Sequence, residues 1–519
     1  MIVETKFMMK NLLYIALLLP FLNFGQKTTE IKVINSDFVD FNQTEIPDAV
    51  LYTGNVQAQH EGATLYCNKA YLFTKTNEIK VFGNVQIHQG DTLSLNSKYG
   101  EYNGNTKLAM ASGDVVMRDA QMTLTTQMIH FDRNTQQAYY NNHGTIVNND
   151  NTLKSVSGRY YATEKLFKFR NAVEITNPEY VINTNYLDYH TDSGLAYLTD
   201  ESTIKSEDTF IYTEKGLYDT KNNFSHLTKN SYIIYDNKRI EGDSLYYDRK
   251  TEFASATNNF KITDTINKFV ARGNYAEVYR LKDSLILTRR PLLITESEDK
   301  DSLYMNAQRI VVTGKQGQRI VKAFKNARFY KTNMSGKCDS LHSSEITGIT
   351  QLIGRPVLWN GESQLTGDLM HLISNKETQK LDSLKVMNNV FIIEKDTLGT
   401  GFNQVKGQNL YGRFKDGKLA EVDIIKNTEM IYYVYDSGNE LYGIDKNTSS
   451  RINLTFDEDS KIENITFFTS PKGETYPENK LPENARKLRG FVWRGDERIL
   501  SKDEVILPDE QEEIPKKEE

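Results

Sequence analysis

A short pattern that returns about every 30 residues constrains the fold of this chain more than any other feature of its sequence. In each copy a Gly or Asn is followed two residues later by an apolar residue, and a second apolar residue comes two positions after that. One such unit is too small to bury its own apolar face, so tandem units must stack and share a core. The clear copies begin at Gly54, Gly83, Gly113, Gly144 and Asn171, and weaker copies begin at Asn230, Asn258, Asn326, Gly354 and Asn388.

Each unit has the composition of two short strands. Gly and Asn tolerate a positive φ, which suits a tight turn leading into a strand. The residues that follow alternate between apolar and polar, which is the period of a strand with one buried face. A second apolar segment begins about ten residues after the Gly, as at Thr64, and a polar turn such as that at Asp132 closes the unit. About twelve such units across residues 50–430 predict an all-β, elongated repeat structure.

The composition favours the same fold class. The 519 residues include 30 Tyr and 24 Phe but only 10 Pro, and aromatic residues fit a pleated, half-buried surface whereas Pro does not. The formal net charge is −6, so the surface as a whole is not basic enough to bind nucleic acid. We therefore expect no nucleic-acid partner.

The first 25 residues resemble a cleavable export signal. Lys6 and Lys10 precede an apolar run from Leu12 to Phe24, which is too short to span a bilayer, and the small residue Gly25 follows. A buried helix is the alternative interpretation of this run. We expect residues 1–25 to be removed and the mature protein to be exported.

The repeat pattern ends at Pro471. We therefore divide the mature chain into a repeat region, residues 26–470, in one or two sub-arrays, and a charged, Pro-containing tail, residues 471–519. Within the tail, the aromatic and basic segment Leu488–Arg494 either caps the last strand or docks a partner. Residues 508–519 are nearly all charged or Pro, and we predict that they are disordered.

No group of residues suggests catalysis. Cys67 and Cys338 lie far apart in the sequence, and we expect two unpaired thiols that serve as packing residues. The eight His residues are scattered without the spacing of metal ligands, and the sequence contains neither a nucleophile elbow nor a phosphate-binding loop. We expect no catalytic residue, no metal and no cofactor, so the chain is not predicted to be an enzyme.

The alternation also predicts which side chains point inward in the first three clear units, because every second residue of a strand faces the same side. Two interpretations of these side chains remain open: they pack on one another in a closed core, or they line a groove. The positions are Val56, Ala58, Leu65, Leu72, Val85, Ile87, Leu93, Leu95, Val115, Met117, Met122 and Leu124.

The Gly-Asn/Asp-Val turn at Gly54, Gly83 and Gly113, with a Leu-containing strand about ten residues later, resembles the OstA family of periplasmic lipopolysaccharide-transport proteins, which includes the LptA-like proteins. The resemblance covers about residues 30–430. It implies a half-open β-jellyroll solenoid whose inward side chains, the twelve positions above, line a groove for the acyl chains of lipid A. It also implies pairing of exposed edge strands with other Lpt-type β-jellyroll proteins, or head-to-tail self-association.

Together, the export signal and this resemblance predict a non-enzymatic periplasmic carrier or bridge in lipopolysaccharide transport to the outer membrane. The alternative is a secreted β-solenoid with a structural or adhesive role, a closed core and no lipid cargo. A polysaccharide-acting β-helix enzyme is disfavoured, because no cluster of acidic residues marks one face of the repeat.

Overall fold

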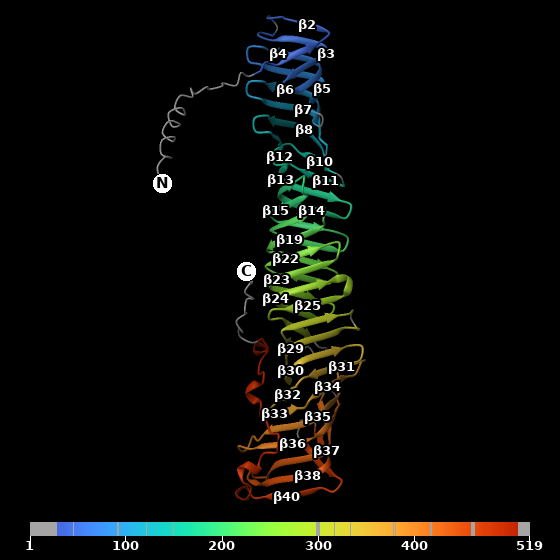
Figure 1. Cartoon of the computed structure of the whole chain (residues 1–519), viewed down its shortest axis with the longest axis vertical. Helices are drawn as coiled ribbons and strands as arrows, with labels where there is room; N and C mark the ends of the chain where they lie inside the picture. Colours follow the sequence, from blue (N-terminus) through green and yellow to red (C-terminus); the bar gives the residue numbers. More distant parts are fainter. Residues whose placement is uncertain are drawn as a thin grey trace, which may run out of the picture. The chain divides into compact units, whose positions relative to one another are not determined.

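The computed structural model describes residues 29–506 except 45, 91–92, 121, 149, 297–300, 316, 333, 377, 379, 416–417 and 458–461. The predicted export signal and the predicted disordered residues 508–519 lie outside the described residues. The described chain forms two compact units, an N-terminal unit that ends at Ser193 and a C-terminal unit that begins at Gly194. Strands make up most of each unit (Figure 1), which confirms the predicted all-β fold class. Within the described part, no helix is long and apolar enough to span a membrane.

The N-terminal unit is an antiparallel arrangement of strands. They are β1 (Lys32–Asn35), β2 (Phe38–Asp40), β3 (Val50–His60), β4 (Ala63–Phe73), β5 (Glu78–Gln89), β6 (Leu93–Asn103), β7 (Leu108–Arg118), β8 (Thr123–Asp132), β9 (Gln137–Tyr140), β10 (Gly144–Asn148), β11 (Asn151–Ser155), β12 (Ser157–Tyr161), β13 (Leu166–Asn177) and β14 (Tyr180–His190). From β3 to β8 each strand pairs with the next, and β1 and β2 both pair with the opposite edge of β3. Two successive strands of this meander make one sequence repeat.

The Gly-Asn pairs of the sequence lie in the middle of long strands. Pairing of β3 with β4 is interrupted between Thr53 and Val56, and the two residues between them, Gly54 and Asn55, have φ angles of 76° and 43°. A Cβ atom at Gly54 would collide with the side chain of Asp37, so only Gly fits there. The pair is therefore not a turn between two strands, as the sequence suggests, but a bulge that bends one strand into two halves. The same interruption occurs at Gly83–Asn84, Gly113–Asp114 and Asn171–Ala172.

These bends give each layer of the N-terminal unit two walls. One half of every long strand belongs to a first wall, which includes Val56–His60, and the other half belongs to a second wall, which includes Val50–Thr53. The hairpin turns at the free ends of the walls form two rims. We call the turns after β3, β5 and β7 the first rim, and the turns after β4, β6 and β8 the second rim.

The C-terminal unit also consists of antiparallel strands. At many of its bends the two halves of a strand are separate short strands. Its strands are β15 (Leu195–Leu198), β16 (Ser202–Lys205), β17 (Thr209–Thr213), β18 (Lys215–Asp219), β19 (Phe224–Lys229), β20 (Tyr232–Tyr235), β21 (Lys238–Glu241), β22 (Ser244–Asp248), β23 (Phe253–Asp264), β24 (Phe269–Tyr279), β25 (Ser284–Thr288), β26 (Leu292–Glu296), β27 (Ser302–Asn306), β28 (Arg309–Thr313), β29 (Ile320–Lys331), β30 (Met334–Ser344), β31 (Ile349–Ile353), β32 (Val357–Asn360), β33 (Ser363–Thr366), β34 (Leu369–Ser374), β35 (Leu381–Lys395), β36 (Phe402–Lys415), β37 (Lys418–Tyr435), β38 (Leu441–Phe456), β39 (Ile462–Phe468) and β40 (Lys472–Tyr476). The short 3-10 helices are η1 (Arg280–Lys282), η2 (Glu478–Lys480), η3 (Glu483–Ala485), η4 (Gly495–Glu497) and η5 (Lys502–Glu504).

At the bends of this unit, Asn often takes the place of Gly. In β23 the bulge residues Asn258 and Asn259 have φ angles of 56° and 47°. The amide of Asn259 donates a hydrogen bond of 2.8 Å to Asp243. Asn tolerates the left-handed conformation better than other residues with a side chain. Here its amide also ties the bend to the preceding layer.

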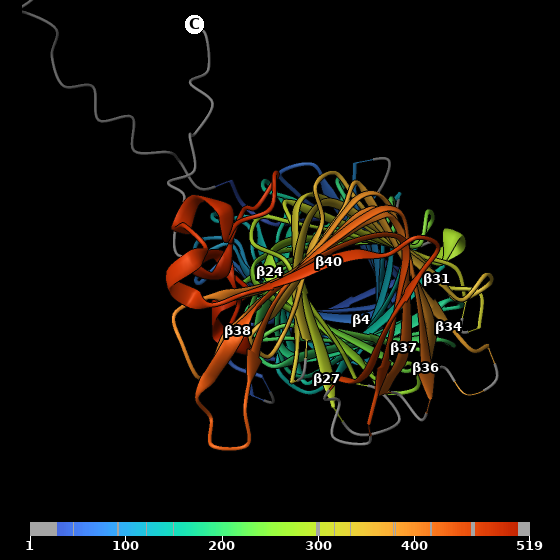
Figure 2. The ribbon, with the colours of Figure 1, turned by 90° about the horizontal axis from the view of Figure 1, so that it is seen from below.

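The chain after β40 folds back along the C-terminal unit. Residues 477–506, which we call the strap, pack Leu481, Leu488 and neighbouring aromatic residues against β35, β37 and β38. Figure 2 shows the strap in red beside β38 and β40. The buried Gln404 side chain donates to the carbonyl of Arg486 at 2.8 Å and accepts from the N–H of Leu488 at 2.9 Å. Gln364 makes the same pair of backbone hydrogen bonds further along the strap.

Candidate functional site

A cavity of about 120 Å³ lies between the two walls of the N-terminal unit. One water molecule needs about 10–15 Å³, so this cavity has room for a ligand of many atoms. Most of the surface that lines it is apolar, and its polar part comes from Gln59, His60, Gln89, Glu101, Tyr102 and Arg133. Leu65 and Leu95 line it from the first wall, and the small residues Gly100, Ala109 and Ala111 line it from the second wall.

The structure divides the twelve predicted inward residues into two equal groups. Six line the cavity: Ala58, Leu65, Ile87, Leu93, Leu95 and Met117. The other six are buried in the core: Val56, Leu72, Val85, Val115, Met122 and Leu124. Val56, Val85 and Val115 come directly after the bulges, where the two walls meet and leave no space. Closed core and cavity lining therefore occur along the same strands.

Several of the cavity-lining residues keep part of their apolar surface uncovered. Leu65, Ile87, Leu93 and Leu95 are only half-buried, although they face the interior. Covering such surface with hydrocarbon is favourable, by about 0.8 kcal/mol for each methylene removed from water. The interior of the N-terminal unit is therefore suited to an aliphatic chain.

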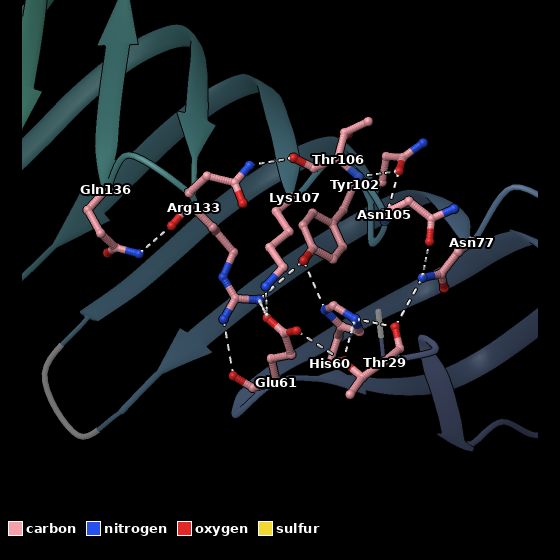
Figure 3. A network of polar contacts seen from close by, with 12 residues as sticks. Thr29, His60, Glu61, Asn77, Tyr102, Asn105, Thr106, Lys107, Arg133 and Gln136 are labelled. Carbon is pink, nitrogen blue, oxygen red and sulfur yellow. Dashed lines mark hydrogen bonds and ion pairs between the residues drawn. The ribbon is translucent and has the colours of Figure 1, made fainter. Parts of the chain in front are cut away.

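A polar network ties the two rims of the N-terminal unit together (Figure 3). Glu61 comes from the first rim, and Lys107 and Arg133 come from the second rim. The Nζ atom of Lys107 lies 3.0 Å from the Glu61 carboxylate, and Arg133 Nη2 donates to the Glu61 carbonyl at 3.1 Å. We call these three residues, together with His60 and Tyr102, the N-terminal seam.

His60 and Tyr102 extend this seam into the interior. The His60 Nε2 atom lies 2.7 Å from the carbonyl oxygen of Thr29, which can only accept, so Nε2 carries a proton. In the neutral imidazole, the His60 Nδ1 atom accepts from the Tyr102 hydroxyl at 2.9 Å, and that hydroxyl accepts from Arg133 Nη1 at 3.2 Å. This chain of hydrogen bonds fixes the guanidinium of Arg133, and all three side chains line the cavity.

The seam carries more positive than negative charge. The hydrogen bond from Lys107 holds the pKa of Glu61 below its usual value, although desolvation acts in the opposite direction. Burial raises the pKa of Tyr102, against the opposing influence of Arg133. Glu61 is therefore ionised and Tyr102 is neutral at pH 7, so two cations face one carboxylate.

A seam also joins the rims of the C-terminal unit, with a different balance of charge. Arg280, from the turn after β24, donates to Asp208, from the turn after β16, at 2.6 Å. Its guanidinium also lies 3.6 Å from Asp236 and 3.6 Å from Glu252. Arg280 and Asp208 are 72 residues apart, and so are Arg133 and Glu61. We call Arg280, its three carboxylates, Thr209 and Tyr247 the C-terminal seam.

Sequence reasoning missed both seams, since each acidic residue stands at a turn and looks like an ordinary solvated charge. The recurrence of an acid and an Arg at the same spacing was the signal that could have identified them. The two cysteines are buried thiols, and desolvation raises the pKa of Cys67 to about 11 and that of Cys338 to about 12. Among the described residues, no group of His, Cys, Asp and Glu is arranged to hold a metal ion.

Comparison with known proteins places the N-terminal part of the chain. Residues 28–185 match the family model described as OstA-like protein, which confirms the predicted resemblance over this part of the predicted range of about residues 30–430. No curated protein matches the chain. A crystal structure of LptH, the LptA-homologous periplasmic component of the lipopolysaccharide transport device from Pseudomonas aeruginosa, is similar at 15% identity and a TM-score of 0.19. The match covers 20% of this chain and 74% of LptH.

Proposed function

We propose that this chain, OstA-like over its N-terminal unit, is a non-enzymatic periplasmic carrier or bridge that holds the acyl chains of lipopolysaccharide on their way to the outer membrane. The observation that carries the proposal is the apolar cavity between the walls of the OstA-like unit. In this proposal, residues 1–25 direct export and the six cavity-lining residues from the predicted set contact lipid.

The physical argument is that acyl chains cannot cross water without cover. Each methylene that leaves water contributes about 0.8 kcal/mol, so even a short chain segment inside the cavity is held firmly. Leu65, Leu93 and Leu95 present flexible aliphatic surface, which adapts to chains of different length. Carriage of this kind requires no bond to be made or broken.

The first strands of the N-terminal unit support the proposed assembly with other jellyroll proteins. β1 and β2 pair with β3, and no described strand pairs with their other edge. Phe38 is 74% exposed, and Val39 and Phe41 are exposed beside it. Exposed strand edges with apolar side chains favour the addition of a partner strand. We propose that another Lpt-type β-jellyroll, or a second copy of this chain, adds to this edge.

Photo-crosslinking in living cells tests the lipid cargo. A benzophenone amino acid replaces Leu95, which lines the cavity, or Leu108, an exposed Leu of the same unit that lies outside the cavity lining. We expect a lipopolysaccharide adduct from position 95 and none from position 108. The same label at Val39 reports the partner at the β1–β2 edge.

Absence of adducts at Leu95 in an exported and folded protein contradicts the carrier. That outcome favours the alternative, a secreted β-solenoid with a structural or adhesive role. Equal adducts at Leu95 and Leu108 also contradict it, because they indicate contact with lipid at the surface and not in the cavity.

A further inference from the structure

The guanidinium of Arg133 lines the cavity, and its positive charge forms no direct hydrogen bond to a carboxylate. Its hydrogen bonds go to the neutral Tyr102 hydroxyl and to the backbone carbonyl of Glu61. The Glu61 carboxylate lies 3.9 Å from Arg133 Nη1, beyond hydrogen-bond distance, and is held at 3.0 Å by Lys107 instead. The Arg133 side chain is 12% exposed, so this positive charge is largely removed from bulk water.

No second carboxylate near the cavity compensates Arg133 among the described residues. Glu101 also lines the cavity, but its carboxylate forms an ion pair of 3.3 Å with Lys80 and accepts a hydrogen bond from Tyr99. Arg133 is the only Lys or Arg among the residues that line the cavity, and Lys107 lies just outside the lining, where it holds the Glu61 carboxylate. The N-terminal seam beside the cavity therefore has two cations for one carboxylate. An apolar cavity with a cationic end matches a molecule with a hydrocarbon chain and an anionic head.

We infer that Lys107 and Arg133 bind the phosphate or carboxylate head group of an amphiphile whose hydrocarbon chain occupies the cavity, and that the Glu61 carboxylate competes with this head group for the two cations. The inference rests on the proposed function and adds the head-group site to it. Hydrogen bonds between guanidinium or ammonium groups and phosphate are about twice as strong as neutral ones. The hydrogen bonds from Arg133 to Tyr102 and the Glu61 carbonyl fix the guanidinium before the ligand arrives, which reduces the entropy lost on binding.

The C-terminal seam does not have this capacity. Arg280 already donates to Asp208 at 2.6 Å and has two further carboxylates within 3.6 Å. An added anion would meet three negative charges for one positive charge. The comparison gives a control inside the same protein: loss of Arg280 should not change the binding of an anionic amphiphile to the N-terminal unit.

Calorimetric titration of the full chain tests the site with three probes. Dodecyl phosphate has the chain and the anionic head, dodecanol has the chain alone, and inorganic phosphate has the head alone. We expect dodecyl phosphate to bind about tenfold more tightly than dodecanol, and inorganic phosphate to bind much more weakly than either. Arg133→Gln and Lys107→Gln should each remove most of the preference for the phosphate.

Glu61→Gln separates a binding site from a merely structural seam. If Glu61 competes with the head group, this variant binds dodecyl phosphate several-fold more tightly and dodecanol unchanged; a structural role predicts weaker binding or none. Lys98→Gln, which removes an exposed charge that belongs neither to the cavity lining nor to the N-terminal seam, is the matched control and should change nothing. Thermal unfolding confirms that each variant is folded.

The remaining outcomes distinguish the two proposals. Failure of both dodecyl probes to bind contradicts the carrier function itself. Equal binding of the two dodecyl probes in the wild type and in Glu61→Gln overturns the head-group site and leaves the carrier intact. Inorganic phosphate that binds as tightly as dodecyl phosphate also overturns the inference, because the cavity then contributes nothing.

Discussion

The two seams use the same geometry with opposite charge balance. In both units an Arg in one turn contacts an acidic residue in a turn 72 residues earlier in the chain. Each Arg also lies over a Tyr ring, with Arg133 at 6.0 Å from Tyr102 and Arg280 at 5.4 Å from Tyr235. The N-terminal seam has two cations for one carboxylate, whereas the C-terminal seam has one cation for three carboxylates.

The difference in charge balance distinguishes a contact that holds the turns together from a contact that is also able to bind an anion. Rims that face each other need a contact to hold them together, and an Arg that spans the gap provides it in either unit. A saturated Arg such as Arg280 is suited to that structural task alone. Spare positive charge beside an apolar cavity, as at Arg133, contributes less to the closure and is available to an anion.

The largest losses of stability are expected when the Arg of each seam is removed. Arg280→Gln removes the cation that contacts Asp208, Asp236 and Glu252, two of which are about half exposed to water, so we expect the C-terminal unit to lose about 1–2 kcal/mol. Arg133→Gln leaves Lys107 beside Glu61, and we expect a loss of about 1 kcal/mol. Urea denaturation measures both, and hydrogen exchange at residues 280–283 and 133–136 localises the change.

An exposed ion pair of the C-terminal unit supplies the control. Arg413 pairs with Glu421 and its side chain is 71% exposed, so Arg413→Gln should change the stability little. Equal losses from Arg280→Gln and Arg133→Gln would show that the charge balance of the seams has no structural consequence.

Acid should weaken both seams. The substitution Glu61→Gln should remove the acid response of the N-terminal seam and leave that of the C-terminal seam. Burial alone would raise the pKa of Asp208, but the hydrogen bond and charge of Arg280 hold it below the usual value of 3.8. Lys107, with help from the hydrogen bond of Thr29, holds the pKa of Glu61 below the usual 4.5. A lowered pKa stabilises the fold above the usual value, and this stability is lost as the pH falls through the lowered one.

Hydrogen exchange at the rim turns, corrected for its intrinsic pH dependence, should therefore accelerate in both units below about pH 4. Glu61→Gln should abolish the acceleration at residues 104–107 and 133–136 and leave that at residues 280–283. An unchanged acid response of the N-terminal turns in this variant would mean that Glu61 does not control the N-terminal seam.

The sequence could predict the repeat but not how the strand bends. Alternation and the Gly-Asn pairs identify stacked strands, because both features depend on neighbouring residues. Whether Gly54 is a turn or a bulge depends on the pairing of β3 with β4, since the same positive φ serves either. The pairing is a long-range property, and the local pattern does not contain it.

The cavity and the seams could not be predicted from the sequence either, because both depend on contacts between distant residues. Gly100 and Ala109 look like weak strand residues, and only the pairing of the strands shows that they line a cavity opposite Leu65 and Leu95. Arg133 and Glu61 are separated by 72 residues, so their contact depends on the cumulative register of every strand between them. The sequence identified the six buried members of the predicted set as inward-facing. It could not show that they pack in the core and do not line the cavity.

The smallest expected losses concern the two tyrosine hydroxyls. The Tyr102 hydroxyl forms hydrogen bonds with His60 Nδ1 at 2.9 Å and with Arg133 Nη1 at 3.2 Å. The Tyr247 hydroxyl lies 3.5 Å from the Thr209 hydroxyl. Tyr102→Phe leaves the buried His60 Nδ1 without a donor, so we expect a loss of about 1–2 kcal/mol; Tyr247→Phe should cost about 0.5 kcal/mol or less.

Urea denaturation of the single variants, and of Tyr102→Phe combined with Arg133→Gln, measures this difference. The double variant should lose less than the sum of its parts, because the two side chains belong to one hydrogen-bond chain. Additive losses would show that Tyr102 does not position Arg133. The head-group site would then lack the support that distinguishes it from the C-terminal seam.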